Sequence, residues 1–166
     1  MNQPTRFYQK HIDELPASSY GWAWLGEVGR GHGADNVERI EFQKLGGIVV
    51  AWKDGVLACY FVILRDLYNY TAIHGLDVLG IEDHGMDLRL CEGIGDANVQ
   101  GDEWFDALCT RYDVRQTEIN ENPAGAVIRS AWDVRHRLIG YYVIFKDPQG
   151  WAWLALQDLN QPHTED

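Results

Sequence analysis

Apolar and polar residues alternate in several short runs along the chain, which is the pattern of half-buried β-strands. The clearest pair is Ile48–Trp52 and Val56–Leu64, which flank Asp54-Gly55. Asp-Gly tolerates the positive φ angles of a tight turn, so this segment is predicted to be a β-hairpin. A second hairpin is predicted from two apolar runs around a type I turn sequence: Leu138–Lys146, Asp147–Gly150 and Trp151–Leu156.

Three further strands are predicted from shorter alternating runs: Tyr20–Val28, Met86–Glu92 and Val114–Ile119. Residues 29–35 are predicted to be a loop because they are rich in glycine. Residues 37–45 fit a helix and a strand equally well, so both interpretations stay open for this segment.

Helical spacing is clearest in residues 102–112, where apolar side chains recur at i, i+3, i+4 and i+7 and Asp102 is placed to cap the first turn. A short helix over Arg6–Leu15 is predicted to stop at Pro16. Asn122-Pro123 is predicted to open a third helix. A strand over residues 126–134 is the alternative there.

These elements predict an α+β fold, with a mainly antiparallel sheet, two clear hairpins and two to four packed helices. At 166 residues, 46% of them hydrophobic, the chain is long enough for one domain, expected over residues 1–158 with a polar tail at 159–166. No run approaches the roughly 18–20 apolar residues that span a bilayer, and the first residues lack a secretory pattern. We therefore expect a cytoplasmic protein that binds no membrane.

The three cysteines, Cys59, Cys91 and Cys109, are widely spaced and form no Cys-x-x-Cys motif. Cys59 lies in an apolar run and Cys109 on the apolar stripe of the predicted helix. Both are expected to be buried, reduced thiols and not catalytic nucleophiles, since apolar surroundings oppose a thiolate.

Negative charge is concentrated in one part of the chain. Twelve of the twenty-five acidic residues, but only three of the fourteen basic ones, lie between Asp77 and Glu121, so most of the net charge of −11 falls in this acidic block. A block of one sign favours a surface that meets a positively charged partner, and it disfavours direct binding of nucleic acid. The alternative is that these acids only keep the surface solvated.

Within the acidic block, carboxylates gather around the start of the predicted helix, and Trp104 lies off its apolar stripe. Trp104 is therefore expected to be partly exposed, as an anchor in a docking face. The predicted partner-binding residues are Asp96, Asp102, Glu103, Trp104, Asp106 and Asp113.

The pentapeptide Gly-Trp-Ala-Trp-Leu occurs twice, at residues 21–25 and 150–154. Alternate residues of a strand share a face, so each copy would present two indoles together. If the two strands are neighbours, the indoles of Trp22, Trp24, Trp151 and Trp153 could form a platform for a sugar, a nucleotide or a cation. Aromatic packing in the core is the alternative.

His-Gly-x-Asp occurs three times, at residues 32–35, 74–77 and 84–87. Imidazole and carboxylate groups can together bind a metal ion or act as a general base with its orienting group. The candidate ligands are His32, His74, Asp77, His84 and Asp87. Against this, glycine within each unit is typical of turns, and an Asp that caps its own turn needs no metal.

No nucleophile elbow or phosphate-binding loop is present, so we assign no catalytic residue or cofactor and expect a protein without enzymatic activity. The expected function is to neutralise a protein target by covering a basic, nucleic-acid-facing site, such as that of a nuclease. Acidic immunity proteins and anti-defence proteins that mimic nucleic acid share this general character. The alternatives are a small metal-dependent enzyme that uses the histidine turns and a binding module that uses the tryptophan pairs.

Overall fold

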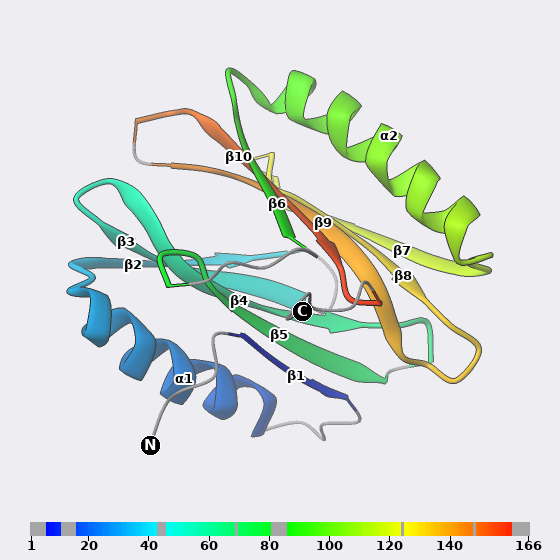
Figure 1. The fold of residues 1–166 in the computed structure, drawn as a ribbon, viewed down its shortest axis with the longest axis horizontal. Helices are drawn as coiled ribbons and strands as arrows, with labels where there is room; N and C mark the ends of the chain where they lie inside the picture. Colours follow the sequence, from blue (N-terminus) through cyan, green and yellow to red (C-terminus); the bar gives the residue numbers. More distant parts are fainter. Residues whose placement is uncertain are drawn as a thin grey trace, which may run out of the picture. The chain divides into compact units, whose positions relative to one another are not determined.

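The computed structural model describes residues 6–10, 16–42, 46–68, 70–80, 86–123, 125–147 and 149–160 (Figure 1). The chain divides into two compact units, Met1–Glu41 with Leu45–Glu82 and Phe42–Lys44 with Asp83–Asp166. Each unit has its own sheet, helix and core. The single domain expected over residues 1–158 stays a prediction.

The first unit is a five-stranded antiparallel sheet with one helix on it. Its elements in chain order are β1 (Arg6–Lys10), α1 (Pro16–His32), β2 (Asn36–Glu41), β3 (Gly46–Lys53), β4 (Val56–Arg65) and β5 (Thr71–Asp77). The strand order across the sheet is β1-β5-β4-β3-β2, so the first strand pairs with the last.

The second unit is also a five-stranded antiparallel sheet with one helix. Its elements are β6 (Met86–Cys91), α2 (Ile94–Arg111), β7 (Gln116–Glu121), β8 (Val127–Trp132), β9 (Leu138–Lys146) and β10 (Ala152–Asp158). The strand order is β6-β10-β9-β8-β7, and again the first strand pairs with the last.

The two units therefore have the same connectivity, a strand, a helix and four strands, and the same strand order. The helix also packs on the sheet in the same way in both units: a glycine of the helix lies over an aromatic ring of the central strand of the sheet. A Cβ at Gly21 of α1 would overlap the ring of Phe61 in β4. A Cβ at Gly101 of α2 would lie 3.1 Å from the ring of Tyr142 in β9. The same topology thus occurs twice in the chain, and neither the Gly-Trp-Ala-Trp-Leu repeat nor the His-Gly-x-Asp repeat in the sequence indicates this.

The α+β class and both hairpins are confirmed. Asp54 and Gly55, between β3 and β4, have φ angles of 52° and 83°, which are the left-handed values that the Asp-Gly turn predicts. The strands at 86–92 and 114–119 are confirmed as β6 and β7, with small shifts of their ends. Residues 37–41 of the ambiguous segment lie in the edge strand β2, so the strand interpretation is confirmed there. The tail at 159–166 lies outside the described residues from position 161 onward.

The predicted strand at Tyr20–Val28 is wrong, because this segment lies within helix α1. Its buried residues are Gly21, Trp24, Leu25 and Val28, which recur at i, i+3, i+4 and i+7 and pack on the sheet. The loop predicted at 29–35 is correspondingly shorter, since α1 continues to His32.

Two predicted helices are also wrong. Residues 6–10 form strand β1, paired with β5, and residues 11–15 lie outside the described residues. Residues 127–132 form β8, the strand alternative, which lies between β7 and β9 and is buried on both faces. A central strand with both faces buried is apolar almost throughout, and over six residues such a run cannot be told from a helical stripe.

The helix predicted at 102–112 is confirmed but begins eight residues earlier than predicted, at Ile94, after the N-cap residue Gly93. Asp102 therefore lies in the middle of α2, and the predicted capping role is wrong. Of the two helices in the described part of the chain, neither is long and apolar enough to cross a membrane.

Candidate functional site

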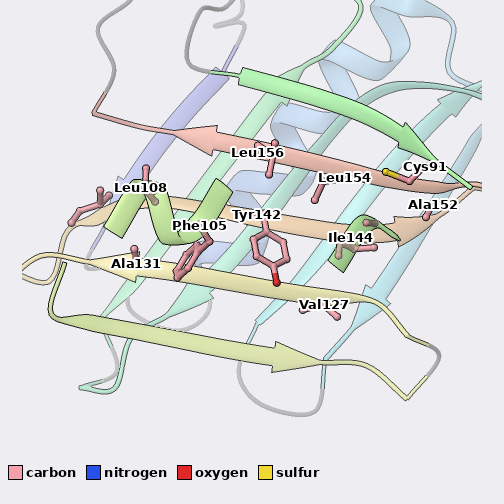
Figure 2. Close-up of a cluster of buried hydrophobic side chains, with 12 residues drawn as sticks. Cys91, Phe105, Leu108, Val127, Ala131, Tyr142, Ile144, Ala152, Leu154 and Leu156 are labelled. Carbon is pink, nitrogen blue, oxygen red and sulfur yellow. The ribbon is translucent and has the colours of Figure 1, made fainter. Parts of the chain in front are cut away.

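Helix α2 carries most of the predicted partner-binding residues, and the packing of its inner face determines which of them are exposed. Its buried side is formed by Ala97, Phe105 and Leu108, with Gly101 over Tyr142. The rings of Phe105 and Tyr142 meet edge to face, with centroids 5.9 Å apart (Figure 2). Glycine at position 101 is what allows the helix to approach the sheet this closely.

Asp102 is bound to the sheet beneath the helix. Its Oδ1 accepts hydrogen bonds from Arg129 Nη1 at 2.8 Å and from the Tyr142 hydroxyl at 2.7 Å. The Arg129 guanidinium also lies 4.5 Å from the centre of the Phe105 ring. Burial and the Asp102 carboxylate both raise the pKa of Tyr142, so the hydroxyl stays a donor to Asp102 at neutral pH. Asp102 thus joins α2 to β8 and β9.

The end of α2 is attached in a similar way. Arg111 Nη1 and the Tyr112 hydroxyl each donate to Asp158 Oδ2 of β10, both at 2.9 Å. Asp158 is buried, with 3% of its surface exposed. The middle and the end of α2 are therefore fixed by two separate carboxylates.

The outward side of α2 carries a stripe of exposed residues with helical spacing. We call Asp96, Val99, Glu103 and Asp106 the outer stripe; all four side chains are exposed, Val99 by 58%. Asp96 Oδ2 accepts a hydrogen bond from Gln100 at 3.1 Å. Among the described residues, neither Glu103 nor Asp106 forms an ion pair.

The two other predicted partner-binding residues lie off the outer stripe. Trp104 is half-buried and packs against the core of the second unit, so the expectation of partial exposure is met. Asp113 follows the helix with a φ of 51° and forms an exposed ion pair with Arg115 at 3.1 Å. Exposed pairs of this kind add little stability, and the partner reduces the charge that Asp113 presents.

The tryptophan platform needed two neighbouring strands, and the structure does not provide them. The first copy of the pentapeptide is in helix α1, where Trp24 is buried and Trp22 meets Phe61 edge to face at 6.0 Å. The second copy leads into β10, where Trp151 is 43% exposed and the indole of Trp153 donates to Asp147. Of the second copy, Trp151 precedes β10 and only Trp153 lies in the strand.

The His-Gly-x-Asp segments are not all turns: His32 ends helix α1, and residues 74–77 lie in strand β5. His32 Nε2 and Asp77 Oδ1, from different copies of the motif, lie 2.6 Å apart and connect the end of α1 to the end of β5. His74 lies within β5, three residues before Asp77, so its side chain points to the opposite face of the sheet. His84 lies outside the described residues, and Asp87 pairs with Arg89. In the described part of the chain, no three His, Cys, Asp or Glu side chains gather as a metal site would require.

Cys59 is buried beside the same region, opposite Asp77 in the register of β4 and β5. Burial and the Asp77 carboxylate raise the pKa of its thiol to about 12. A thiol with this pKa is almost entirely protonated at neutral pH, so the site lacks the thiolate that a cysteine nucleophile needs.

Sequence reasoning missed Arg129, Tyr142 and Asp158, which decide the role of the α2 carboxylates and of the residues at its end. Their signal is weak in the sequence, because each lies at least 27 positions from the residue that it binds.

The chain matches no family model, no curated protein and no solved structure.

Proposed function

We propose that the protein is an acidic binding protein that neutralises a protein target by covering its basic, nucleic-acid-facing site, and that the outer stripe of α2 makes the contact. The observation that carries the proposal is the row of exposed carboxylates of Asp96, Glu103 and Asp106 on one side of a single helix. In the described part of the chain none of the three forms an ion pair, and Asp96 accepts only a hydrogen bond from the neutral amide of Gln100.

A row of carboxylates can take the place of phosphates opposite arginine and lysine side chains. Their combined field also accelerates the encounter with a basic partner. The exposed side chain of Val99 lies among these acids and adds apolar area that a partner could bury.

The attachment of α2 supports the same proposal. Because Asp102 and Asp158 fix the helix to the sheet, binding orders few additional groups, and the entropic cost of association is smaller. The predicted contact surface becomes narrower than the sequence suggested. Asp102 serves the fold, and the acids of the outer stripe serve the contact together with Val99.

The test is a double charge reversal on the outer stripe, Glu103→Lys with Asp106→Lys. Its matched control is Glu27→Lys with Glu38→Lys, which changes the net charge equally at two exposed residues of the first unit. Tagged proteins are used to capture partners from a lysate of the source organism at low and at high salt. The captured partner is then purified and its association rate measured.

The proposal expects one partner with a basic surface whose association slows at high salt. The stripe variant should bind it at least about tenfold more slowly, as is typical when electrostatic steering is removed, while the control stays close to wild type. Addition of the protein should also release nucleic acid from the partner. Equal binding by both variants would contradict the proposal, and so would a partner that keeps its nucleic acid.

A further inference from the structure

A second candidate site is a shallow depression of about 410 Å³ on the second unit. It is lined by Glu92, Gln149, Gly150 and Trp151. Trp151 is 43% exposed although it is a large apolar side chain, and the Glu92 carboxylate beside it is exposed as well. Neither side chain belongs to the buried core under α2.

The pairing of β6 with β10 brings these two residues together. Cys91 pairs with Ala152 and both point into the core under α2. Glu92 and Trp151 are the residues directly beyond this pair on the two strands, and alternation along a strand directs their side chains to the opposite face, where both line the depression. Side chains at directly opposite positions are within contact distance, their Cβ atoms about 5 Å apart.

The turn before β10 holds Trp151 in place. Asp147, which is buried, accepts hydrogen bonds through Oδ1 from the backbone N–H groups of Gln149 at 2.9 Å and Trp151 at 3.0 Å. Its Oδ2 accepts the indole N–H of Trp153 at 3.0 Å. Gly150 has a φ of 95°, a backbone conformation that favours glycine. These hydrogen bonds hold the backbone of Gln149 and Trp151, which lowers the entropic cost of binding a ligand on the Trp151 indole.

We infer that this depression binds an organic cation, a guanidinium or alkylammonium group, stacked on the indole of Trp151 and paired with the carboxylate of Glu92. An indole face attracts cations more strongly than any other aromatic side chain. The carboxylate of Glu92 adds charge complementarity to a cation, and it repels the phosphate of a nucleotide. The Gln149 side chain at the rim can accept a hydrogen bond from the same group.

The site is independent of the outer stripe, and the experiment separates the two. The full-length protein, labelled with ¹⁵N in its indoles, is titrated with Nα-acetyl-argininamide and with tetramethylammonium while the indole N–H signals are followed by NMR. The Trp151 signal is assigned from a Trp151→Phe variant. Nα-acetyl-citrullinamide, the uncharged analogue of the arginine probe, and sodium chloride at equal ionic strength are the reference titrations.

The inference expects a saturable shift of the Trp151 signal with the cations, with a Kd on the order of millimolar for such small ligands, and no saturable shift with either reference. Glu92→Gln should weaken binding about twofold to fivefold, as expected for one exposed ion pair, and Trp151→Ala should abolish it. Glu103→Gln, an equal charge change on the outer stripe, should leave the Kd unchanged.

Comparison of the two cations identifies the source of the ligand. Tighter binding of the arginine probe supports a side chain of a partner protein, and tighter binding of tetramethylammonium supports a free quaternary amine. Equal shifts with the citrulline analogue would overturn the inference, because the charge would then play no part. A shift that rises with sodium chloride alone would overturn it as well. The titrations of the wild-type protein decide these outcomes, so of the variants only Trp151→Phe, which assigns the signal, has to fold.

Discussion

Asp102 lies among the acids of α2, yet its contacts assign it to the fold. Substitution by alanine would remove the acceptor of two hydrogen bonds, from the Arg129 guanidinium at 2.8 Å and from the Tyr142 hydroxyl at 2.7 Å. Tyr142 is 1% exposed, whereas the side chains of Asp102 and Arg129 are 51% and 29% exposed. Loss of the tyrosine contact should therefore cost more than loss of the ion pair.

The magnitude follows from these exposures. A hydrogen bond to a charged group contributes about 1.5–3 kcal/mol, and the lower end applies because water reaches Asp102. The half-exposed ion pair contributes about 0.5 kcal/mol. Alanine in a helix interior recovers about 0.5 kcal/mol relative to aspartate. The expected loss of unfolding free energy for Asp102→Ala is therefore about 1.5 kcal/mol.

Urea unfolding followed by circular dichroism gives this quantity from the shift in midpoint at constant slope. Glu103→Ala is the control, since it removes a neighbouring exposed acid with no ion pair in the described part of the chain, and it should stay within about 0.5 kcal/mol of wild type. In a double-mutant cycle with Tyr142→Phe, the coupling energy should be about 1 kcal/mol. Additive changes in the cycle, or an Asp102→Ala cost no larger than that of the control, would refute the structural role of Asp102.

Three further predictions concern other parts of the chain. Gly21→Ala should destabilise the protein, because overpacking against Phe61 costs about 1–3 kcal/mol and outweighs the better helix propensity of alanine. Gly26→Ala in the same helix is the control, since its added Cβ meets only the flexible end of an arginine side chain at 3.7 Å. It should stabilise the protein by about 0.5–1 kcal/mol, as measured by urea unfolding. Cys59, with its thiol pKa raised to about 12, should resist iodoacetamide at pH 8 until urea unfolds the chain, as read by mass spectrometry of its peptide; rapid labelling of the native protein would contradict this. Burial opposes ionisation of Asp133, but hydrogen bonds from its own turn outweigh this effect and lower its pKa. The stability lost in Asp133→Asn at pH 7 should therefore shrink as the pH falls below the ordinary carboxyl value of 3.8 and wild-type Asp133 becomes protonated. A difference in stability between Asp133→Asn and wild type that is independent of pH would show that the charge does not matter.

The elements that were predicted correctly are those whose signal is local. The turn between β3 and β4 depends on two adjacent residues that tolerate positive φ, and Asp54-Gly55 forms it. The apolar residues Phe105, Leu108, Cys109 and Tyr112 recur with helical spacing over more than one turn, and α2 is present. Both signals lie within a few residues, so the sequence determines them without knowledge of the rest of the chain.

The pentapeptide Gly-Trp-Ala-Trp-Leu shows where local sequence stops being sufficient. The same five residues lie in helix α1 at 21–25 and at the start of strand β10 at 150–154. In the helix Trp24 and Leu25 are buried, whereas in the strand Ala152 and Leu154 are buried. The pentapeptide fits both the 3.6-residue period of a helix and the two-residue period of a strand. The surface available for burial in each unit decides which of the two structures forms.

The sequence alone determines that there is an acidic block. The tertiary structure decides which of its carboxylates bind to the sheet and which stay exposed. Composition alone places most of the negative charge between Asp77 and Glu121. Which acids stay available for a partner depends on residues far along the chain, such as Arg129 and Tyr142, which lie 27 and 40 positions from Asp102. The order of strands in the sheet brings these groups under α2, and the sum of long-range contacts that fixes this order cannot be read from local patterns.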